Sequence, residues 1–428
     1  MDFSIALSSI LLLVFLFMRL PVFIAILSAA AIYFVMHPNL NAVIFAQRVL
    51  AGSQSIPLLA IPFFVCAGIF MNYTGVTKRI IDFCEALVGN IIGGIGHVTV
   101  LVATLMGGLS GSNLADAAME AKMLVPEMEK RGFSRVFGSV LVATSAIITP
   151  LIPPGIAMII YGSIANVSIG KLFVAGIAPG IMLCIFLMLL VAFVSYKRGY
   201  RSTVKVDTSA ARVWTTFKGA FLPLCLPIII IGGIRIGAFT PTEAGSVAIV
   251  YSLLLGIIYR EMRLTDVIKG LKETVLTSSA IMLIIAAASA FAWVLTKEKI
   301  PQYFTSLFVD HLNSAIVFLL FVNLFLIFIG MFIEGNAAMI ILVPLLAPIA
   351  KHFGIDEIHF AMVVIFNFAL GAISPPMGTL MFVTCSITKV KMGAFIKEAV
   401  PFYTLLIICL LLLTFVPALT TGFVNMVY

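Results

Sequence analysis

Long apolar runs, separated by short polar or proline-containing breaks, follow one another along this chain. Clear runs occupy residues 181–194, 222–231, 316–332 and 403–416. Because about 20 apolar residues cross a bilayer as a helix, the chain has room for roughly ten to twelve crossings. The first run, 3–18, has no basic segment before it and no small-residue cleavage site after it, so we predict a retained helix. The pattern predicts an all-α polytopic membrane protein.

Two segments have the spacing of amphipathic helices. Residues 76–90 place Ile80 and Cys84 on one face, with charged residues towards the other face. Residues 263–275 do the same with Leu264 and Ile268. Such helices lie in the interface between lipid and water, so we predict an arm helix in each segment.

Prolines interrupt the apolar pattern twice in the same way. "TPLIPPG" lies at 149–155 and "GAISPPMGT" at 371–379, and Pro375 follows Pro153 by 222 residues. The same offset pairs further residues, namely Pro126 with Pro348, Phe173 with Phe395, and Pro179 with Pro401. Weak internal symmetry with interrupted segments in corresponding positions is typical of secondary transporters.

The repeat predicts two halves, each with one hairpin and one broken helix. The first half is 1–196 and the second is 219–428, joined by a basic connecting loop at 197–218. Polar, glycine-containing tips predict re-entrant hairpins near 105–130 and 316–350. The broken helices are expected near 149–156 and 371–379. A lone transmembrane proline only kinks a helix, but repeated tips and breaks favour a functional site over that simpler explanation.

The breaks predict binding chemistry, because helix ends expose unpaired backbone groups. Freed carbonyls attract cations, and N-terminal amides attract carboxylates. Sodium is a hard cation that takes several oxygen ligands, including carbonyls and hydroxyls. The candidate residues near the tips and breaks are Ser110, Ser112, Asn113, Thr149, Gly335, Asn336, Ser374 and Thr379.

Acidic residues near the tips have several interpretations. Asp116 and Glu120, near Lys122, could form a proton relay, but the favoured interpretation is a solvated helix that leaves the membrane. Glu334 at the second tip is a candidate for the site itself. Glu243 is expected to cap its own helix with Thr240 or Thr242 as partner.

Composition and charge remove other classes of protein. Only 10% of the 428 residues are charged and 62% are hydrophobic, whereas a soluble protein has about 25% charged residues. The net charge is +8, and the 197–218 loop holds six basic residues against the single acid Asp207, which indicates a cytoplasmic loop rather than nucleic-acid binding. The cysteines and histidines lack metal-ligand spacing. We find no P-loop and no nucleophile motif, so we expect neither an enzyme nor a cofactor.

Several blocks resemble the large membrane subunit, the M or DctM-like subunit, of tripartite ATP-independent periplasmic (TRAP) transporters. They are "LLAIPFFVCAGIFMNYTGVTKRIIDF" (58–83), "LSGSN" (109–113), "PLIPPG" (150–155), "GKLFVAGIAPG" (170–180) and "GAFTPTEAGSVAIVYSLLLGIIYRE" (237–261). The last block is the most specific, and the resemblance covers nearly the whole chain. It implies an inverted-repeat, elevator-type transporter of the bacterial inner membrane that imports a small organic acid, such as a C4-dicarboxylate or sialic acid.

The resemblance also implies coupling to sodium ions, a small four-helix membrane subunit (DctQ-like) and a periplasmic substrate-binding protein as partners, beside membrane lipid. It places one sodium site at Ser110, Ser112, Thr149, Pro153 and Gly155. It places a second at Gly330, Gly335, Gly371, Ser374 and Met377. Substrate is expected near Ser110, Asn113, Asn336 and Thr379. The alternative is a stand-alone ion-coupled organic anion transporter or exchanger of related architecture, and an intramembrane enzyme ranks third.

Overall fold

The computed structural model describes residues 3–18, 20–37, 39–200, 206–311 and 314–428. These residues form α-helices, α1 to α20, and one 3-10 helix, η1, with no strand among the described residues. The all-α prediction is therefore confirmed. Residues Arg201 and Lys205 of the predicted basic loop lie outside the described ranges.

Seven segments are long and apolar enough to cross a membrane by length and composition. They are η1 with α4 (Ile56–Leu59 and Ala60–Tyr73), α10 (Ile169–Arg198), α11 (Ala210–Arg235), α12 (Pro241–Tyr259), α13 (Leu264–Lys297), α16 (Gly335–His352) and α19 (Met392–Phe415). The other helices are α1 (Phe3–Phe17), α2 (Val22–Met36), α3 (Ala42–Ser53), α5 (Val76–Val88), α6 (Gly94–Ser110), α7 (Asn113–Lys130), α8 (Arg135–Ser145), α9 (Ile156–Ala165), α14 (Ile300–His311), α15 (Ala315–Gly330), α17 (Glu357–Gly371), α18 (Thr379–Thr388) and α20 (Ala418–Val427). Because several of these are paired short helices, the number of crossings stays a prediction.

Helix boundaries recur at the 222-residue offset of the sequence repeat. Helix α7 begins at Asn113 and ends at Lys130, and α16 begins and ends 222 residues later, at Gly335 and His352. Helices α15 to α19 each start within one residue of the position 222 residues after the start of α6 to α10, and their ends differ by at most five residues. Side-chain caps fix some of these starts, since Ser112 and Glu334 each accept a backbone N–H in the first turn of their helix.

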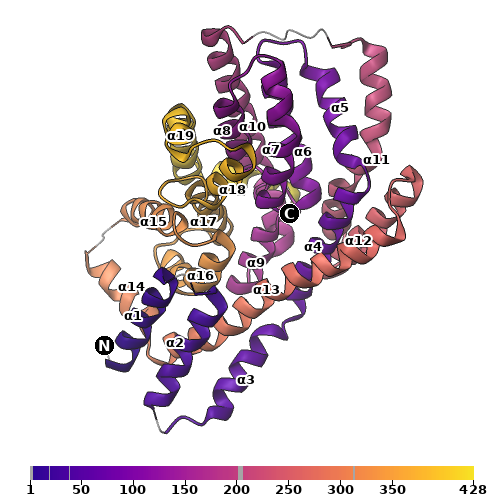
Figure 1. The fold of residues 1–428 in the computed structure, drawn as a ribbon. Coiled ribbons are helices and arrows are strands. Elements are labelled where there is room, and N and C mark those ends of the chain that lie inside the picture. Colours follow the sequence, from indigo (N-terminus) through magenta and orange to yellow (C-terminus); the bar gives the residue numbers. More distant parts are fainter. Residues whose placement is uncertain (1–2, 19, 38, 201–205, 312–313) are drawn as a thin grey trace.

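The hairpins and broken helices of the two parts of the chain pack across one another. Helix α9, after the first break, packs on α16 and α17, and α18, after the second break, packs on α7 and α8. Around them, α13 runs diagonally past α2, α3 and α4, while α12 packs on α4 and α11 on α5 (Figure 1). Each broken helix thus joins its own hairpin to the other hairpin.

Three predicted boundaries change. Residues 263–275 are not a separate arm helix but the first part of α13, because the apolar pattern continues beyond residue 275 without a proline. The connecting loop is shorter than 197–218, since α10 extends to Arg198 and α11 begins at Ala210. The first broken helix opens earlier than residue 149, because α8 already ends at Ser145.

Two local predictions are confirmed. Thr240 and Glu243 form a reciprocal cap at the start of α12, in which the Glu243 N–H donates to the Thr240 hydroxyl at 3.3 Å and the Thr240 N–H donates to the Glu243 carboxylate at 2.8 Å. Helix α5 covers most of 76–90, with Ile80 and Cys84 fully buried. The interfacial position of α5 stays a prediction.

Candidate functional site

The first tip is a two-residue turn, Gly111 and Ser112, between α6 and α7. Gly111 ends α6 with a positive φ of 63°, and the Ser112 hydroxyl accepts the N–H of Ala115 at 3.5 Å to start α7. The opposing break passes close to this tip, because the N–H of Ile156 donates to the carbonyl of Gly111 at 3.4 Å. The tip and the break are therefore joined through their backbones.

The second tip, between α15 and α16, is built from different residues. The Glu334 carboxylate accepts the N–H of Ala337 at 3.0 Å and so caps α16. Gly330 and Gly371 bring α15 and α17 together, since a Cβ on Gly371 would lie 2.7 Å from the Cα of Gly330. Ser374 in the break donates its hydroxyl to the carbonyl of Leu370 at 2.8 Å.

Both tips and both breaks border one cavity of about 70 Å³. The first residues of four helices line it, namely Asn113 of α7, Ile156 of α9, Gly335 of α16 and Thr379 of α18. Asn336 and Glu334 add polar side chains to the same wall. Since a helix N-terminus carries a partial positive charge and free N–H groups, four N-termini around one cavity favour an anionic ligand.

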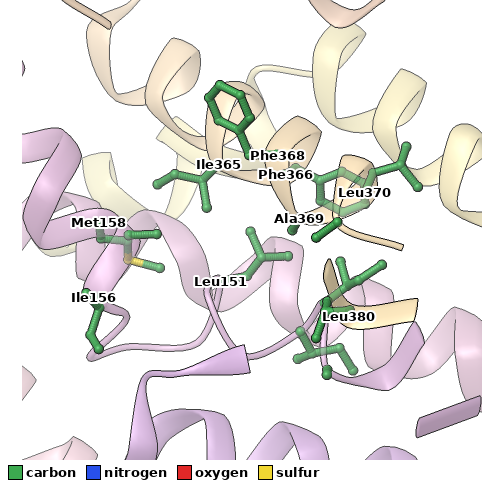
Figure 2. Packing of buried hydrophobic residues seen from close by; sticks show 14 of the residues in the cluster. Leu151, Ile156, Met158, Ile365, Phe366, Phe368, Ala369, Leu370 and Leu380 are labelled. Atoms are coloured by element: carbon green, nitrogen blue, oxygen red, sulfur yellow. The ribbon is translucent and has the colours of Figure 1, made fainter. Parts of the chain in front are cut away.

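Apolar side chains behind the cavity hold the two broken helices together. Leu151, Ile156 and Met158 of the first break and α9 pack in one buried cluster with residues of α17 and with Leu380 of α18 (Figure 2). Ile365, Phe368 and Ala369 of α17 belong to this cluster and also line the cavity. The cavity wall is thus anchored in the protein core.

Asp116 is the centre of a buried polar cluster beside the first tip. Its Oδ2 accepts the Ser110 hydroxyl at 2.6 Å and the Thr149 hydroxyl at 2.9 Å. The Asp116 side chain is only 1% exposed, and so is that of Glu120 one turn further along α7. The favoured sequence interpretation, a solvated helix through these acids, is therefore wrong, because both acids point into the protein.

The structure brings together some of the predicted site residues and separates others. Asn113, Asn336 and Thr379 line the cavity, whereas Ser110 lies behind the tip in the Asp116 cluster. Pro153 and Gly155 are buried in the first break. Met377 of the second predicted sodium site is 40% exposed and does not line the cavity. The ligand roles of all these residues stay predictions.

Asp116 is the main polar residue that sequence reasoning misjudged. Its distance of three residues from the Asn113 start of α7 places it in the first turn, where a carboxylate is favoured by the helix dipole. Only the folding of the break over this turn, which brings Thr149 to Asp116, shows that the carboxylate faces inward. That contact spans 33 residues and has no local signal.

Paired hairpins, broken helices and a shared cavity inside a bundle of apolar helices define a secondary-transporter type of membrane protein. The chain belongs to the TRAP transporter large permease family: the family model "Tripartite ATP-independent periplasmic transporter, DctM component" matches residues 9–419. The chain is therefore a multi-pass inner-membrane transporter subunit and not an enzyme, since the family model and relatives such as SiaM and DctM, described next, are named as transporter components.

Relatives of known name cover almost the whole chain. The sialic acid TRAP transporter large permease protein SiaM of Vibrio cholerae is 38% identical, over 95% of each chain. The C4-dicarboxylate TRAP transporter large permease protein DctM of Pseudomonas aeruginosa is 39% identical, over 89% of each chain. The 2,3-diketo-L-gulonate TRAP transporter large permease protein YiaN of Escherichia coli is 36% identical, over 94% of each chain.

A solved structure shows the same fold at low sequence identity. The YdaH transporter of Alcanivorax borkumensis, described as having an unusual topology, superposes with a TM-score of 0.63 over 96% of this chain and 98% of that chain. The two sequences are 14% identical, so the likeness concerns the fold alone.

Proposed function

We propose that this chain is the translocating subunit of a sodium-driven importer of a small organic acid. The observation that carries the proposal is the cavity on which the N-termini of α7, α9, α16 and α18 converge. Four partial positive charges at this position suit a carboxylate better than a cation or a neutral sugar. Asn113 and Asn336, one from each hairpin, add amide groups that can donate to the same ligand.

The cation sites proposed here lie at the opposite helix ends. Helices α6 and α8 finish at Ser110 and Ser145, and their C-terminal ends present carbonyl groups and a partial negative charge. Asp116 holds the hydroxyls of Ser110 and Thr149, so that their remaining lone pairs are oriented, and it adds a full negative charge nearby. In this arrangement Asp116 positions the oxygen ligands of the first sodium site.

The second sodium site is proposed at the approach of α15 to α17. Gly330 and Gly371 leave no room for a side chain between the two helices, so the backbone at both ends is within reach of one ion. Helices α15 and α17 both end at these glycines, which leaves the last carbonyls of each without partners in the helix. The Ser374 hydroxyl donates its hydrogen to the carbonyl of Leu370, so the lone pairs of the hydroxyl oxygen stay available for a cation.

The mechanism proposed is elevator transport, in which the hairpins and broken helices move together. Its support is the cross-packing of α9 on α16 and α17 and of α18 on α7 and α8, which makes these helices one unit. The proposed partners are a small membrane subunit and a periplasmic binding protein. One relative is the isethionate TRAP transporter permease protein DctMQ of Oleidesulfovibrio alaskensis, whose name combines the letters of the M and Q subunits. This chain covers 64% of that protein.

The test is uptake into proteoliposomes that contain this chain and its small subunit, with the binding protein outside. Sialic acid, a C4-dicarboxylate and 2,3-diketo-L-gulonate are offered separately, each with an inward sodium gradient. We expect uptake of one organic acid that stops when potassium replaces sodium. Equal uptake in potassium and in sodium would refute sodium coupling. Uptake that needs neither the small subunit nor the binding protein would favour the stand-alone transporter.

A further inference from the structure

Glu120 is a buried acid to which the proposed transport cycle assigns no role. It lies one helical turn after Asp116 on α7, so that the two carboxyl groups share a face of the helix. Both side chains are 1% exposed. Both oxygens of Glu120 and Oδ1 of Asp116 have no hydrogen-bond partner among the described residues. Three unpartnered carboxyl oxygens are thus buried close together.

No basic side chain balances this pair in the described part of the chain. Within α7 itself, Lys122 is exposed. On the helices that pack against α7, His97 of α6 contacts the carbonyl of Ile92, and Arg135 of α8 pairs with Glu129. On α18 the remaining titratable group is the thiol of Cys385. On α5, Lys78 is exposed, Arg79 and Glu85 pair with Glu261 and Arg131, Asp82 is itself an acid, and Cys84 is a thiol. Of these, the Cys84 thiol is near enough to interact electrostatically with Glu120.

Burying two ionised carboxylates side by side, without a cation, is far more costly than burying one acid and one carboxylate. A single proton removes this cost. A protonated Glu120 can donate its O–H to Oδ1 of Asp116, which provides a partner for two of the groups that lack one. Oδ2 of Asp116 stays occupied by Ser110 and Thr149.

We propose that Glu120 binds a proton that it shares with Asp116 and that this proton is linked to sodium binding at the first tip. The linkage rests on the proposed function, since it needs a cation near Ser110 and Thr149. A proton on Glu120 lowers the negative charge beside that cation, so protonation weakens sodium binding and sodium binding promotes release of the proton.

Infrared spectroscopy of the purified protein tests the proton directly, without transport or sodium. A protonated, buried carboxyl gives a carbonyl band separate from that of carboxylates. We expect this band in the wild type and in the control Glu129→Gln, which removes a carboxylate of the same helix that pairs with Arg135 at 2.8 Å. We expect it to be lost in Glu120→Gln and shifted in Asp116→Asn, where the acceptor of the proton changes.

An unchanged band in Glu120→Gln, or no band in the wild type, would overturn the proton site. The Asp116→Asn variant keeps Glu120 intact and so decides the question if Glu120→Gln fails to fold. In Asp116→Asn, a carbonyl band at the wild-type position would count against a proton shared with Asp116.

Sodium titration at several pH values then tests the linkage. We expect the sodium dissociation constant of the wild type to rise severalfold per pH unit as pH falls, with a limit of about tenfold for one linked proton. Glu120→Gln should bind sodium more weakly and lose most of this dependence, while Glu129→Gln keeps it. Equal dependence in wild type and Glu120→Gln refutes the linkage. If no variant binds sodium, the proposed sodium coupling and the linkage fail together, and the infrared result still decides the proton.

Discussion

Gly111 at the first tip offers a sharp test of the tip-to-break contact. It has a positive φ of 63°, and a Cβ on it would lie 2.7 Å from the carbonyl oxygen of Pro154. An alanine therefore meets two costs, a left-handed backbone and a clash with the break. Gly132 has a φ of 85° with nothing within 4 Å of its Cβ position, so Gly132→Ala meets only the first cost.

The two costs have different sizes. The left-handed conformation costs an alanine about 1–2 kcal/mol, and inserting a methyl group into a packed site costs about 1–3 kcal/mol. Gly111→Ala should thus lower the free energy of unfolding by about 2–5 kcal/mol. Gly132→Ala should lower it by about 1–2 kcal/mol. The gain from a stiffer unfolded chain is the same in both variants and cancels in the comparison.

Thermal unfolding of both variants in one detergent measures this difference, and solute uptake shows its functional consequence. We expect Gly111→Ala to unfold at a clearly lower temperature than Gly132→Ala and to lose uptake, because the clash displaces the tip from the Pro154 break. Equal unfolding temperatures with equal uptake would refute the close packing of tip and break.

Three further changes test other contacts. Ser110→Ala removes the hydroxyl that donates to Asp116 and that belongs to the proposed cation site. The sodium concentration for half-maximal uptake should rise about tenfold, which is the effect of losing one hydrogen bond to a charged group. An unchanged sodium dependence would exclude Ser110 from the site. Arg131→Met breaks the ion pair of Arg131 with Glu85, which joins the end of α7 to α5. The free energy of unfolding should fall by about 3 kcal/mol, and Arg131→Lys should recover part of this loss. An equal loss in both variants would argue against a stabilising Arg131–Glu85 ion pair. Thr240→Ala removes the cap of α12 and should cost about 1 kcal/mol, while Thr240→Ser should restore the wild-type unfolding temperature; a Thr240→Ala protein as stable as the wild type would contradict the cap.

Periodic and local features of this protein could be predicted from its sequence. Apolar runs gave the helices, and the Thr240 and Glu243 spacing gave the α12 cap that the structure contains. The 222-residue offset located the helix breaks around Pro153 and Pro375, where two adjacent prolines remove two backbone donors. These features depend on neighbouring residues, which is why they can be read along the chain.

The interior of the site could not be predicted, because it depends on contacts between distant segments. Thr149 reaches Asp116 only after the first break folds over α7, and the amphipathic pattern of the acids looks like a solvated helix until then. The burial of Glu120 has the same origin. Likewise, the 263–275 pattern shows an amphipathic face but not that the helix continues to Lys297.

The central claim is that the helix N-termini at the shared cavity bind an organic anion. The most direct measurement is the initial rate of solute uptake by Asn336→Asp and Asn336→Gln under one sodium gradient. Asn336→Asp keeps the size of the side chain and Asn336→Gln keeps the uncharged amide, so only the aspartate adds a negative charge beside the bound anion. We predict that Asn336→Asp transports at least about tenfold more slowly than Asn336→Gln, since like charges in a cavity repel by several kcal/mol. Equal rates in the two variants would contradict an anion at this site.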